Sequence, residues 1–179
     1  MKSLKKIMAN TKRICLMPCA LCLVLVLVDQ IAKGYILYLL TGSVPAFGRA
    51  FNLVPYPYLM ARVTNFFNIV FTWNPGTSFS LFRALGEAAP VAIVVITAAI
   101  IGFFGHVLLR APGRLERISL ALIIGGAVGN LVDRIRFGAV IDFLDFHYAG
   151  YHWPAFNFAD IFICIGVALY VFHWIRRRK

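Results

Sequence analysis

Four long apolar segments separated by polar connections dominate the pattern of this chain. They cover about residues 14–40, 88–109, 118–133 and 160–175. A helix needs about 20 mostly apolar residues to cross the hydrocarbon layer of a bilayer. The second segment has this length without any charge, and the others reach it with the polar residues at their ends. The pattern predicts four transmembrane helices in a single integral membrane domain over residues 1–179.

The connection between the first two apolar segments has a different period. In NIVFTWNPGTSF, the apolar residues Ile69, Phe71 and Trp73 alternate with other residues, as on one face of a strand. The sequence Asn74-Pro75-Gly76-Thr77 follows, with Pro second and Gly third, where a tight turn requires positive φ. We therefore expect a membrane all-α fold with a small β-rich segment at the membrane surface. A plain loop is the alternative.

Basic residues set the expected orientation. Most of the 18 Lys and Arg residues lie before the first span, between the second and third spans, or after the fourth. Cytoplasmic connections carry such an excess, so we expect cytoplasmic termini and extracytoplasmic segments at about residues 41–87 and 134–159. The net charge of +11 is thereby explained by topology, and nucleic-acid binding is not expected. The first apolar run lacks a small-x-small cleavage pattern, so we expect an uncleaved span.

Only 7 acidic residues occur in the chain, and three of them share one depth. Asp29, Asp133 and Asp160 each lie 16 residues from a basic residue at the cytoplasmic side. In a helix this spacing is about 24 Å, which places all three near the outer edge of the hydrocarbon layer. Ionisable groups at such depth are costly and mark functional sites. The alternative is that they are helix-end groups paired for structure.

The acids differ in their neighbours. Asp29 precedes Lys33 by four residues, in the order that favours an ion pair on one helix face, and Asp133 precedes Arg134. Asp142 and Asp160 have no adjacent base, and the turn-prone chain between them is long enough to fold back. Two carboxylates held close together cannot both ionise cheaply, so one keeps a proton while the other acts as a base. A helix cap plus an interfacial acid is the alternative interpretation of this pair.

Other chemistry has weaker support in the sequence. The four cysteines lie in apolar segments; Cys19 and Cys22 have the spacing of a redox or metal pair, but no His lies nearby. We interpret them as small apolar residues packed in the membrane. The chain has no zinc-ligand spacing, phosphate-binding glycine loop or serine nucleophile pattern, so we expect neither a metal nor a cofactor.

Four blocks of sequence carry a resemblance to a known family. DQIAK (29–33), NPGTSFS (74–80), GGAVGNLVDRIRFGAVIDF (125–143) and PAFNFADIFI (154–163) resemble the signature blocks of the lipoprotein signal peptidases, the type II signal peptidases of bacteria. They occur in the family's order and span nearly the whole chain. The resemblance implies that the catalytic residues are Asp142 and Asp160, with supporting or substrate-binding positions at Asp29, Lys33, Asn74, Gly76, Asn130, Asp133, Arg134 and Asn157.

The chain departs from this family's pattern in two places. Pro75 and the pair Thr77-Ser78 stand where small apolar residues are more common, and the stretch between about Gly42 and Phe67 is longer than expected. The first departure concerns the detail of a loop. The second would alter the shape of the external β-rich segment.

The resemblance also implies an activity. The chain would be an intramembrane aspartyl endopeptidase that removes the signal peptide from diacylglyceryl-modified bacterial prolipoproteins, cutting just before the lipid-modified cysteine. It would need no metal or cofactor. Its partners would be these substrates, membrane lipid and cyclic peptide inhibitors of the globomycin type. It would reside as a multi-pass protein in the bacterial cytoplasmic (inner) membrane.

Two other classes of function compete with this interpretation. Intramembrane acids also occur in proton-coupled transporters, and a membrane protein can be a non-catalytic scaffold. Four spans are few for a transporter, no inverted repeat is present in the sequence, and the acids share one depth instead of forming a path. The sequence therefore favours the peptidase.

Overall fold

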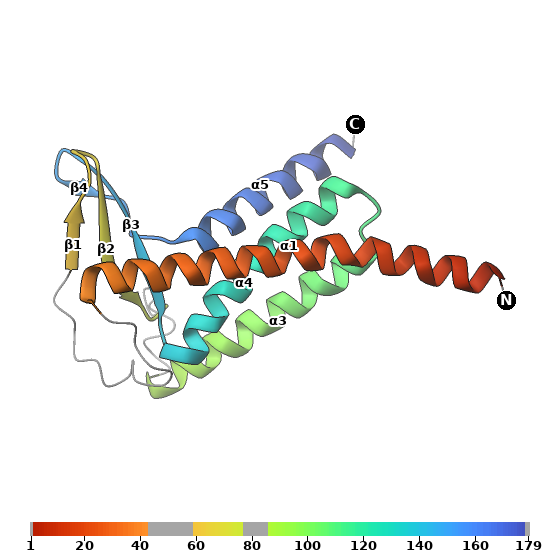
Figure 1. Cartoon of the computed structure of the whole chain (residues 1–179), viewed down its shortest axis with the longest axis horizontal. Helices are drawn as coiled ribbons and strands as arrows, with labels where there is room; N and C mark the ends of the chain where they lie inside the picture. The colour runs from red at the N-terminus through yellow and green to blue at the C-terminus, as the bar shows by residue number, and fades with distance from the viewer. Residues whose placement is uncertain (1, 43–58, 77–85, 178–179) are drawn as a thin grey trace.

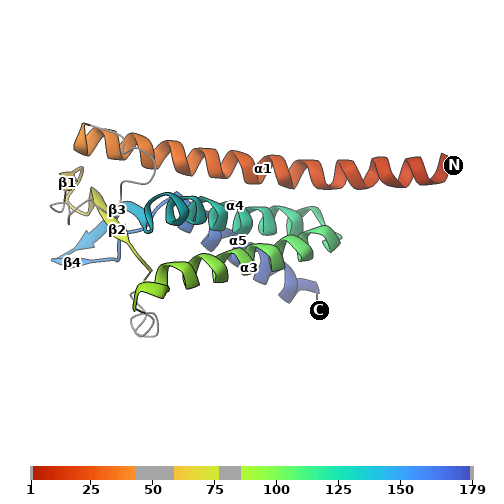
Figure 2. The ribbon, with the colours of Figure 1, turned by 90° about the horizontal axis from the view of Figure 1, so that it is seen from below.

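Four helices and a small sheet make up the computed structural model, which describes residues 2–42, 59–76 and 86–177. The helices are α1 (Lys2–Thr41), α3 (Ala89–Arg110), α4 (Arg114–Phe137) and α5 (Phe158–Arg177). They lie side by side, and the sheet covers one end of the bundle (Figures 1 and 2). Each has a stretch long and apolar enough to cross a membrane: Leu16–Leu40 in α1 and the full lengths of the other three. The predicted four membrane helices are thus confirmed.

Helix α4 lies at the centre of the bundle and packs against the other three helices. Glycines allow this close approach. A Cβ atom on Gly126 would run into the carbonyl oxygen of Ala159 in α5, and one on Gly166 of α5 would lie 2.7 Å from the carbonyl oxygen of Ser119. Small residues at such contacts let helix backbones approach closely within a membrane.

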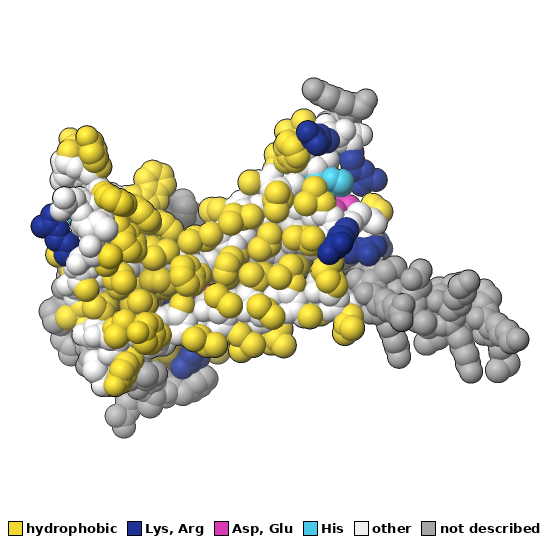
Figure 3. Space-filling model, turned by 45° about the horizontal axis from the view of Figure 1, so that its top comes forward, with side chains coloured by type: hydrophobic (Ala, Val, Ile, Leu, Met, Phe, Trp, Pro, Cys, Tyr) yellow, Lys and Arg dark blue, Asp and Glu magenta, His cyan; other side chains and the backbone are white. Residues whose placement is uncertain are grey.

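The outer helices expose apolar side chains to their surroundings. Exposed apolar residues of α1, α3 and α5 include Leu23, Ile31, Val91, Phe103, Leu109 and Phe172. In the space-filling view, apolar side chains cover much of the helical surface, and the Lys and Arg side chains are gathered mainly near its ends (Figure 3). A soluble protein rarely exposes so large an apolar surface, whereas a bilayer would cover it.

The sheet is antiparallel, with its strands in sequence order: β1 (Leu59–Arg62), β2 (Phe67–Asn74), β3 (Val140–Tyr148) and β4 (Tyr151–His152). The prediction of a small β element is confirmed. Its central strands come from different connections: β2 lies between α1 and α3, and β3 lies between α4 and α5. Strand β3 contains the apolar stretch around Asp142. Most of the long stretch between Gly42 and Phe67 lies outside the described residues.

The predicted alternation along β2 is partly wrong. Ile69 pairs with Leu144, but Thr72 pairs with Asp142, so β2 has one extra residue between these pairs. This β-bulge shifts the alternation. Ile69 consequently lies on the sheet face opposite to Phe71 and Trp73, and Val70 and Phe71 are both buried.

The predicted turn after β2 agrees with the structure as far as it is described. Gly76 has φ of 74°, the left-handed conformation that favours glycine. Its amide donates to Oδ1 of Asn74 at 2.9 Å. The turn therefore begins with an Asn that bonds its own backbone two residues on, while Thr77 and the residues to 85 lie outside the described part.

A buried cluster joins the sheet to the bundle. It contains Leu37 of α1, Phe71 of β2, Phe137 of α4 and Ile141 of β3, with Trp73 packed against it. The left-handed residue Gly138, with φ of 76°, ends α4 and turns the chain directly into β3. This packing fixes the sheet against the helix ends at the level where the acidic residues lie.

Candidate active site

Asp142 is the first of two carboxylates held at the junction between the sheet and the helices. It lies in β3 and is 2% exposed. Its Oδ2 accepts a hydrogen bond from Nδ2 of Asn74 at 2.9 Å, and its Oδ1 accepts one from Nδ2 of Asn157 at 2.7 Å. Asn74 can donate because the turn amide of Gly76 fixes the opposite side of its amide group. Asp142 is therefore held by two neutral donors, one from the end of β2 and one from the residue before α5.

Asp160 is the second carboxylate, and it lies in the first turn of α5. Asn157 precedes this helix, and its Oδ1 accepts from the amide of Asp160 at 3.0 Å. In return, Oδ2 of Asp160 accepts from the amide of Asn157 at 3.2 Å. This reciprocal pair is a capping box. The other oxygen of Asp160 accepts from Nδ2 of Asn130 in α4 at 2.8 Å.

Asn157 connects the two carboxylates. Its side chain is fully buried, with its carbonyl oxygen toward the amide of Asp160 and its amino group toward Asp142. The same amino group also donates to Oδ1 of Asn130 and to the carbonyl oxygen of Ile141. The structure thus brings Asp142 and Asp160 to opposite sides of one asparagine, as the fold-back of the chain predicted.

Burial alters the ionisation of Asp142. Desolvation raises the pKa of Asp142 to about 6, because the charged form loses water. The hydrogen bond from Asn74 acts in the opposite direction, and the negative charge of Asp160 adds to the rise. A carboxyl group in this state can hold a proton at a pH where an ordinary aspartate has lost it.

A buried ion cluster lies beneath the carboxylate pair. Nζ of Lys33 is 2.8 Å from Oδ2 of Asp29 and 2.8 Å from Oδ2 of Asp133, and all three side chains are at most 2% exposed. The predicted pair of Asp29 with Lys33 is present. Asp133, whose sequence neighbour is Arg134, forms its ion pair with Lys33 of α1 across the helix interface. Lys33 also donates to Oδ1 of Asn130 at 3.1 Å.

The two acids of this cluster also hold the main chain beside Asp142 and Asp160. Oδ1 of Asp29 accepts from the amide of Ala159 at 2.9 Å, one residue before Asp160. Oδ2 of Asp133 accepts from the amide of Ile141 at 3.2 Å, one residue before Asp142. The ion cluster therefore fixes the backbone from which each carboxylate of the pair projects.

Sequence reasoning missed Gln30 and Arg136. Nε2 of Gln30 donates to Oδ1 of Asp133 at 2.7 Å and to the carbonyl oxygen of Gly129 at 3.2 Å, and Nη1 of Arg136 donates to Oε1 of Gln30 at 3.2 Å. Gln30 thus orients the carboxylate of Asp133. A polar Gln inside an apolar run, next to Asp29, was a signal that could have indicated this role.

Arg134 and Gly76 lie on the side of the site formed by the turn after β2. A Cβ atom on Gly76 would lie 3.0 Å from Cδ1 of Ile93 and 3.7 Å from Nη2 of Arg134. Within the described ranges, Nε of Arg134 is buried and meets no hydrogen-bond partner. The positive charge of Arg134 interacts with Asp160 and with Asp142, so a cationic side chain lies beside the carboxylate pair.

A partly open apolar cavity of about 310 Å³ adjoins Asp160. Its described lining residues are Trp153, Phe156, Asp160, Ile161, Cys164 and Ile165. Ile165 and Trp153 are exposed on the outer surface of the molecule. A carboxylate at the end of an apolar groove, next to a second carboxylate of raised pKa, is an arrangement suited to acid–base chemistry on an apolar substrate.

Comparison with protein families gives one match over most of the chain. The model described as Signal peptidase (SPase) II matches residues 21–176. A lipoprotein signal peptidase of Anaplasma phagocytophilum is 36% identical over 158 residues, which cover 87% of this chain and 90% of that protein. Another, from Ralstonia nicotianae, is 46% identical over 116 residues, covering 64% of this chain and 67% of the relative.

Solved structures give a similar fold. One bacterial membrane enzyme, determined by the in meso method at 2.3 Å resolution, aligns with a TM-score of 0.68 and 23% identity over 91% of this chain and 90% of its own. A second, determined by the same method at 1.9 Å, aligns with a TM-score of 0.66 and 25% identity over 88% and 92% of the two chains. The arrangement of helices and sheet is therefore shared with these bacterial membrane enzymes.

Proposed function

The chain belongs to the signal peptidase II family, which are bacterial membrane aspartic proteases, and we propose that Asp142 and Asp160 are its catalytic residues. The substrates are prolipoproteins carrying a diacylglyceryl group, cut just before the lipid-modified cysteine. One observation carries this assignment. Asn157 holds both carboxylates at once, beside an apolar groove that begins at Asp160.

The environments of the two acids support different roles. Asp142 is 2% exposed and its pKa is raised to about 6, mainly by burial, so Asp142 is the group that keeps the shared proton. Asp160 is less buried and lies on the wall of the groove, where it can reach a water molecule. Ionised Asp160 is therefore the base, and protonated Asp142 is the acid.

The reaction follows from these roles. Asp160 removes a proton from water as the water oxygen attacks the carbonyl carbon before the lipid-modified cysteine, and Asp142 gives its proton to the carbonyl oxygen. The tetrahedral intermediate then collapses: the C–N bond breaks, and the amine of the cysteine leaves with a proton returned through the pair. Arg134, whose charge acts on both acids, opposes the build-up of negative charge.

The apolar groove beside Asp160 is where the substrate is placed. Its lining by Trp153, Phe156, Ile161, Cys164 and Ile165 suits the apolar residues and acyl chains around the cut. It opens on a helix face that would contact lipid, so a membrane-bound substrate can enter without leaving the bilayer. Cyclic peptides of the globomycin type would compete for this groove.

The proposed orientation places both termini in the cytoplasm, with about residues 41–87 and 134–159 outside the inner membrane and the sheet at the outer surface. The connection between α3 and α4 and the C-terminal end of α5 lie at the bundle end opposite to the sheet (Figure 1). Arg110, Arg114 and Arg117 lie at this connection, and Arg176 and Arg177 end α5. Lys and Arg side chains gather near the ends of the helical surface (Figure 3). Cytoplasmic ends carry such clusters. The four spans then form one membrane domain. Reporter fusions after Lys179 and near Arg62 test this orientation; a C-terminus outside the membrane would contradict it.

Cleavage of a diacylglyceryl-modified precursor by the purified protein in detergent tests the function. Asp142→Asn and Asp160→Asn should each abolish cleavage, and the double variant should be little worse than either, because catalytic partners act as a unit. Glu116→Gln removes a carboxylate of α4 near Arg177, away from the site, and is the matched control. Near-normal turnover by either folded single variant would falsify the aspartyl mechanism.

A further inference from the structure

A second polar cluster lies on the sheet, away from the catalytic pair. Arg62, Asn68 and Asp145 stand directly opposite one another on β1, β2 and β3, so their side chains share one face. Asp142 and Asp145 are three residues apart on β3, and alternate residues of a strand point to opposite faces. This cluster therefore occupies the sheet face opposite to that of Asp142.

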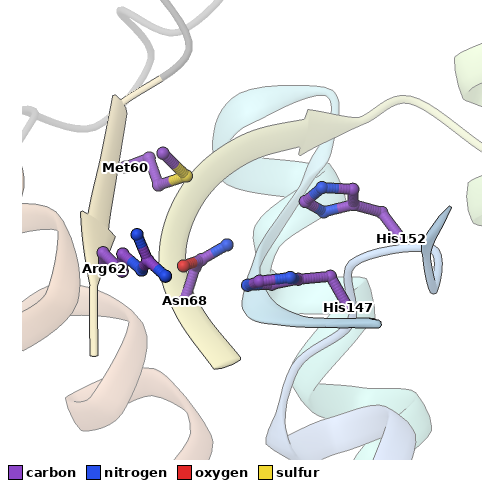
Figure 4. A pocket seen from close by; sticks show the side chains of 5 residues that line it. All are labelled: Met60, Arg62, Asn68, His147 and His152. Carbon is purple, nitrogen blue, oxygen red and sulfur yellow. The ribbon is translucent and has the colours of Figure 1, made fainter. Parts of the chain in front are cut away.

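The cluster borders an open cavity of about 540 Å³ (Figure 4). Its described lining residues are Met60, Arg62, Asn68, His147 and His152. His147 and His152 are paired across β3 and β4, and their rings are stacked with centroids 4.9 Å apart and planes 23° apart. Figure 4 shows both rings extending toward the side of the cavity from which Arg62 and Asn68 approach.

Asp145 lies behind this cavity and fixes one of its histidines. It is 3% exposed, and it accepts from Nδ2 of Asn68 at 2.8 Å and lies 2.9 Å from Nδ1 of His152. Burial is the largest single influence on the pKa of Asp145, and it raises this pKa. The hydrogen bonds from Asn68 and His152, together with the charge of the histidines, outweigh burial, so the pKa of Asp145 lies below its ordinary value. Ionised Asp145 can only accept, so Nδ1 of His152 carries a hydrogen and Nε2 is left for the cavity.

The other nitrogen donors beside the cavity belong to His147 and Arg62. Nε2 of His147 is buried and meets no hydrogen-bond partner among the described residues. The guanidinium of exposed Arg62 donates through Nη2 to Asn65 at 2.8 Å, which leaves further N–H groups of its five. Two stacked imidazoles and a guanidinium border this cavity and form a set of donors that matches a tetrahedral anion.

We propose that this cavity binds a phosphate group, held by the guanidinium of Arg62 and by the Nε2–H groups of His147 and His152. Among the described residues, the charged and titratable groups on this face of the sheet are Arg62, Asp145, His147 and His152. Asp145 offsets one positive charge, and its carboxylate is already engaged by Asn68 and His152. The phosphate can come from a phospholipid headgroup or from solution. The proposal does not depend on the peptidase activity.

Nuclear magnetic resonance of the full chain, labelled with ¹⁵N in its histidine rings and kept in phosphate-free detergent, tests the proposal. The chain has 4 His residues, and His106 and His173 lie in α3 and α5 as internal controls. Inorganic phosphate should shift the ring signals of His147 and His152 saturably and leave the other two unchanged. Arg62→Gln should weaken binding ~10-fold or more, since one charge-assisted contact is lost. Arg110→Gln, with the same charge change in the last turn of α3, should not.

A second arm separates the sources of phosphate. The same spectra are recorded without added phosphate in nanodiscs of phosphatidylglycerol and of phosphatidylcholine. Shifts of His147 and His152 in phosphatidylglycerol alone support a lipid headgroup as the ligand, and shifts with inorganic phosphate alone support an anion from solution. The proposal is overturned by unshifted signals in both arms, by equal shifts of all four histidines, or by binding that Arg62→Gln leaves unchanged.

Discussion

Asn157 and Asp160 hold each other by two reciprocal hydrogen bonds at the start of α5, of 3.0 and 3.2 Å. The main-chain carbonyl oxygen of Asn157 also accepts the first helical bond, from the amide of Ile161 at 3.3 Å. The side-chain amino group of Asn157 donates to Oδ1 of Asp142 at 2.7 Å. One residue therefore both starts the helix that carries one acid and fixes the other acid.

Substitution of Asn157 can separate these two roles. Serine is a good N-cap and preserves the bond to the amide of Asp160, but it cannot donate to Asp142 as the amide does. We expect Asn157→Ser to keep the start of α5 and to lose about 100-fold in kcat, because the acid is misplaced. It also loses the buried bonds to Asn130 and Ile141, so it should be less stable than the unmodified chain. Asn157→Ala should lose the same activity and be about 1 kcal/mol less stable than the serine variant. Normal kcat in the serine variant would show that the bond to Asp142 is not needed.

The ion cluster of Lys33 predicts an unequal effect of removing its members. Lys33→Met leaves Asp29 and Asp133 buried without a counter-charge, which should cost about 3–5 kcal/mol. Asp29→Asn leaves the pair of Lys33 with Asp133, and its amide oxygen can still accept from Ala159. We therefore expect a milder loss of stability and partial activity. Thermal unfolding and cleavage, measured side by side, check this; a folded Asp29→Asn variant as inactive as Asp142→Asn would instead make Asp29 catalytic.

The contact between α4 and α5 predicts a positional effect of glycine substitution. A Cβ atom on Gly126 would overlap the carbonyl oxygen of Ala159, next to Asp160, so Gly126→Ala should separate the helices and cost about 1–3 kcal/mol together with activity. Gly102 in α3 has nothing within 4 Å of its added Cβ, and Gly102→Ala is the matched control, expected to be neutral or slightly stabilising. Equal behaviour of the two variants in thermal unfolding would contradict this packing.

The sequence could predict features that depend on neighbours along the chain. Apolar segment length indicated the four helices, and the four-residue spacing of Asp29 and Lys33 indicated their ion pair. The Asn74-Pro75-Gly76 sequence indicated the turn because a positive φ is required at one known position. The equal spacing of three acids from basic residues placed them at one depth, where the structure connects them through Lys33 and Asn130.

Features that depend on contacts between distant segments could not be predicted in this way. Asp133 has a basic neighbour in the sequence, yet its partner Lys33 is on another helix, because side-chain direction on α4 decides which base it meets. The bulge in β2 changes which residues share a face without any glycine or proline to mark it. Strand β1 has only four residues, too few for a period to be visible.

The hydrogen bond from Asn74 to Asp142 predicts a change in the pH dependence of cleavage. This bond stabilises the ionised carboxylate, and it opposes the burial that raises the pKa of Asp142 to about 6. Asn74→Ala removes the donor, so the pKa of Asp142 should move further above its ordinary value. If the reaction needs one proton on the pair, the alkaline limb of the kcat/KM profile marks the loss of that proton.

The alkaline limb should therefore move to higher pH in Asn74→Ala, while kcat falls because Asp142 is less well placed. Asn65→Ala is the matched control, since Asn65 lies in the connection between β1 and β2 and contacts Arg62, not Asp142. The measurement is kcat/KM for a lipid-modified precursor across the pH range in which both variants stay folded. An acid limb that moves to higher pH, with the alkaline limb unmoved, would mean that the ionised form of Asp142 is the active one, and the acid and base roles of Asp142 and Asp160 would then be exchanged.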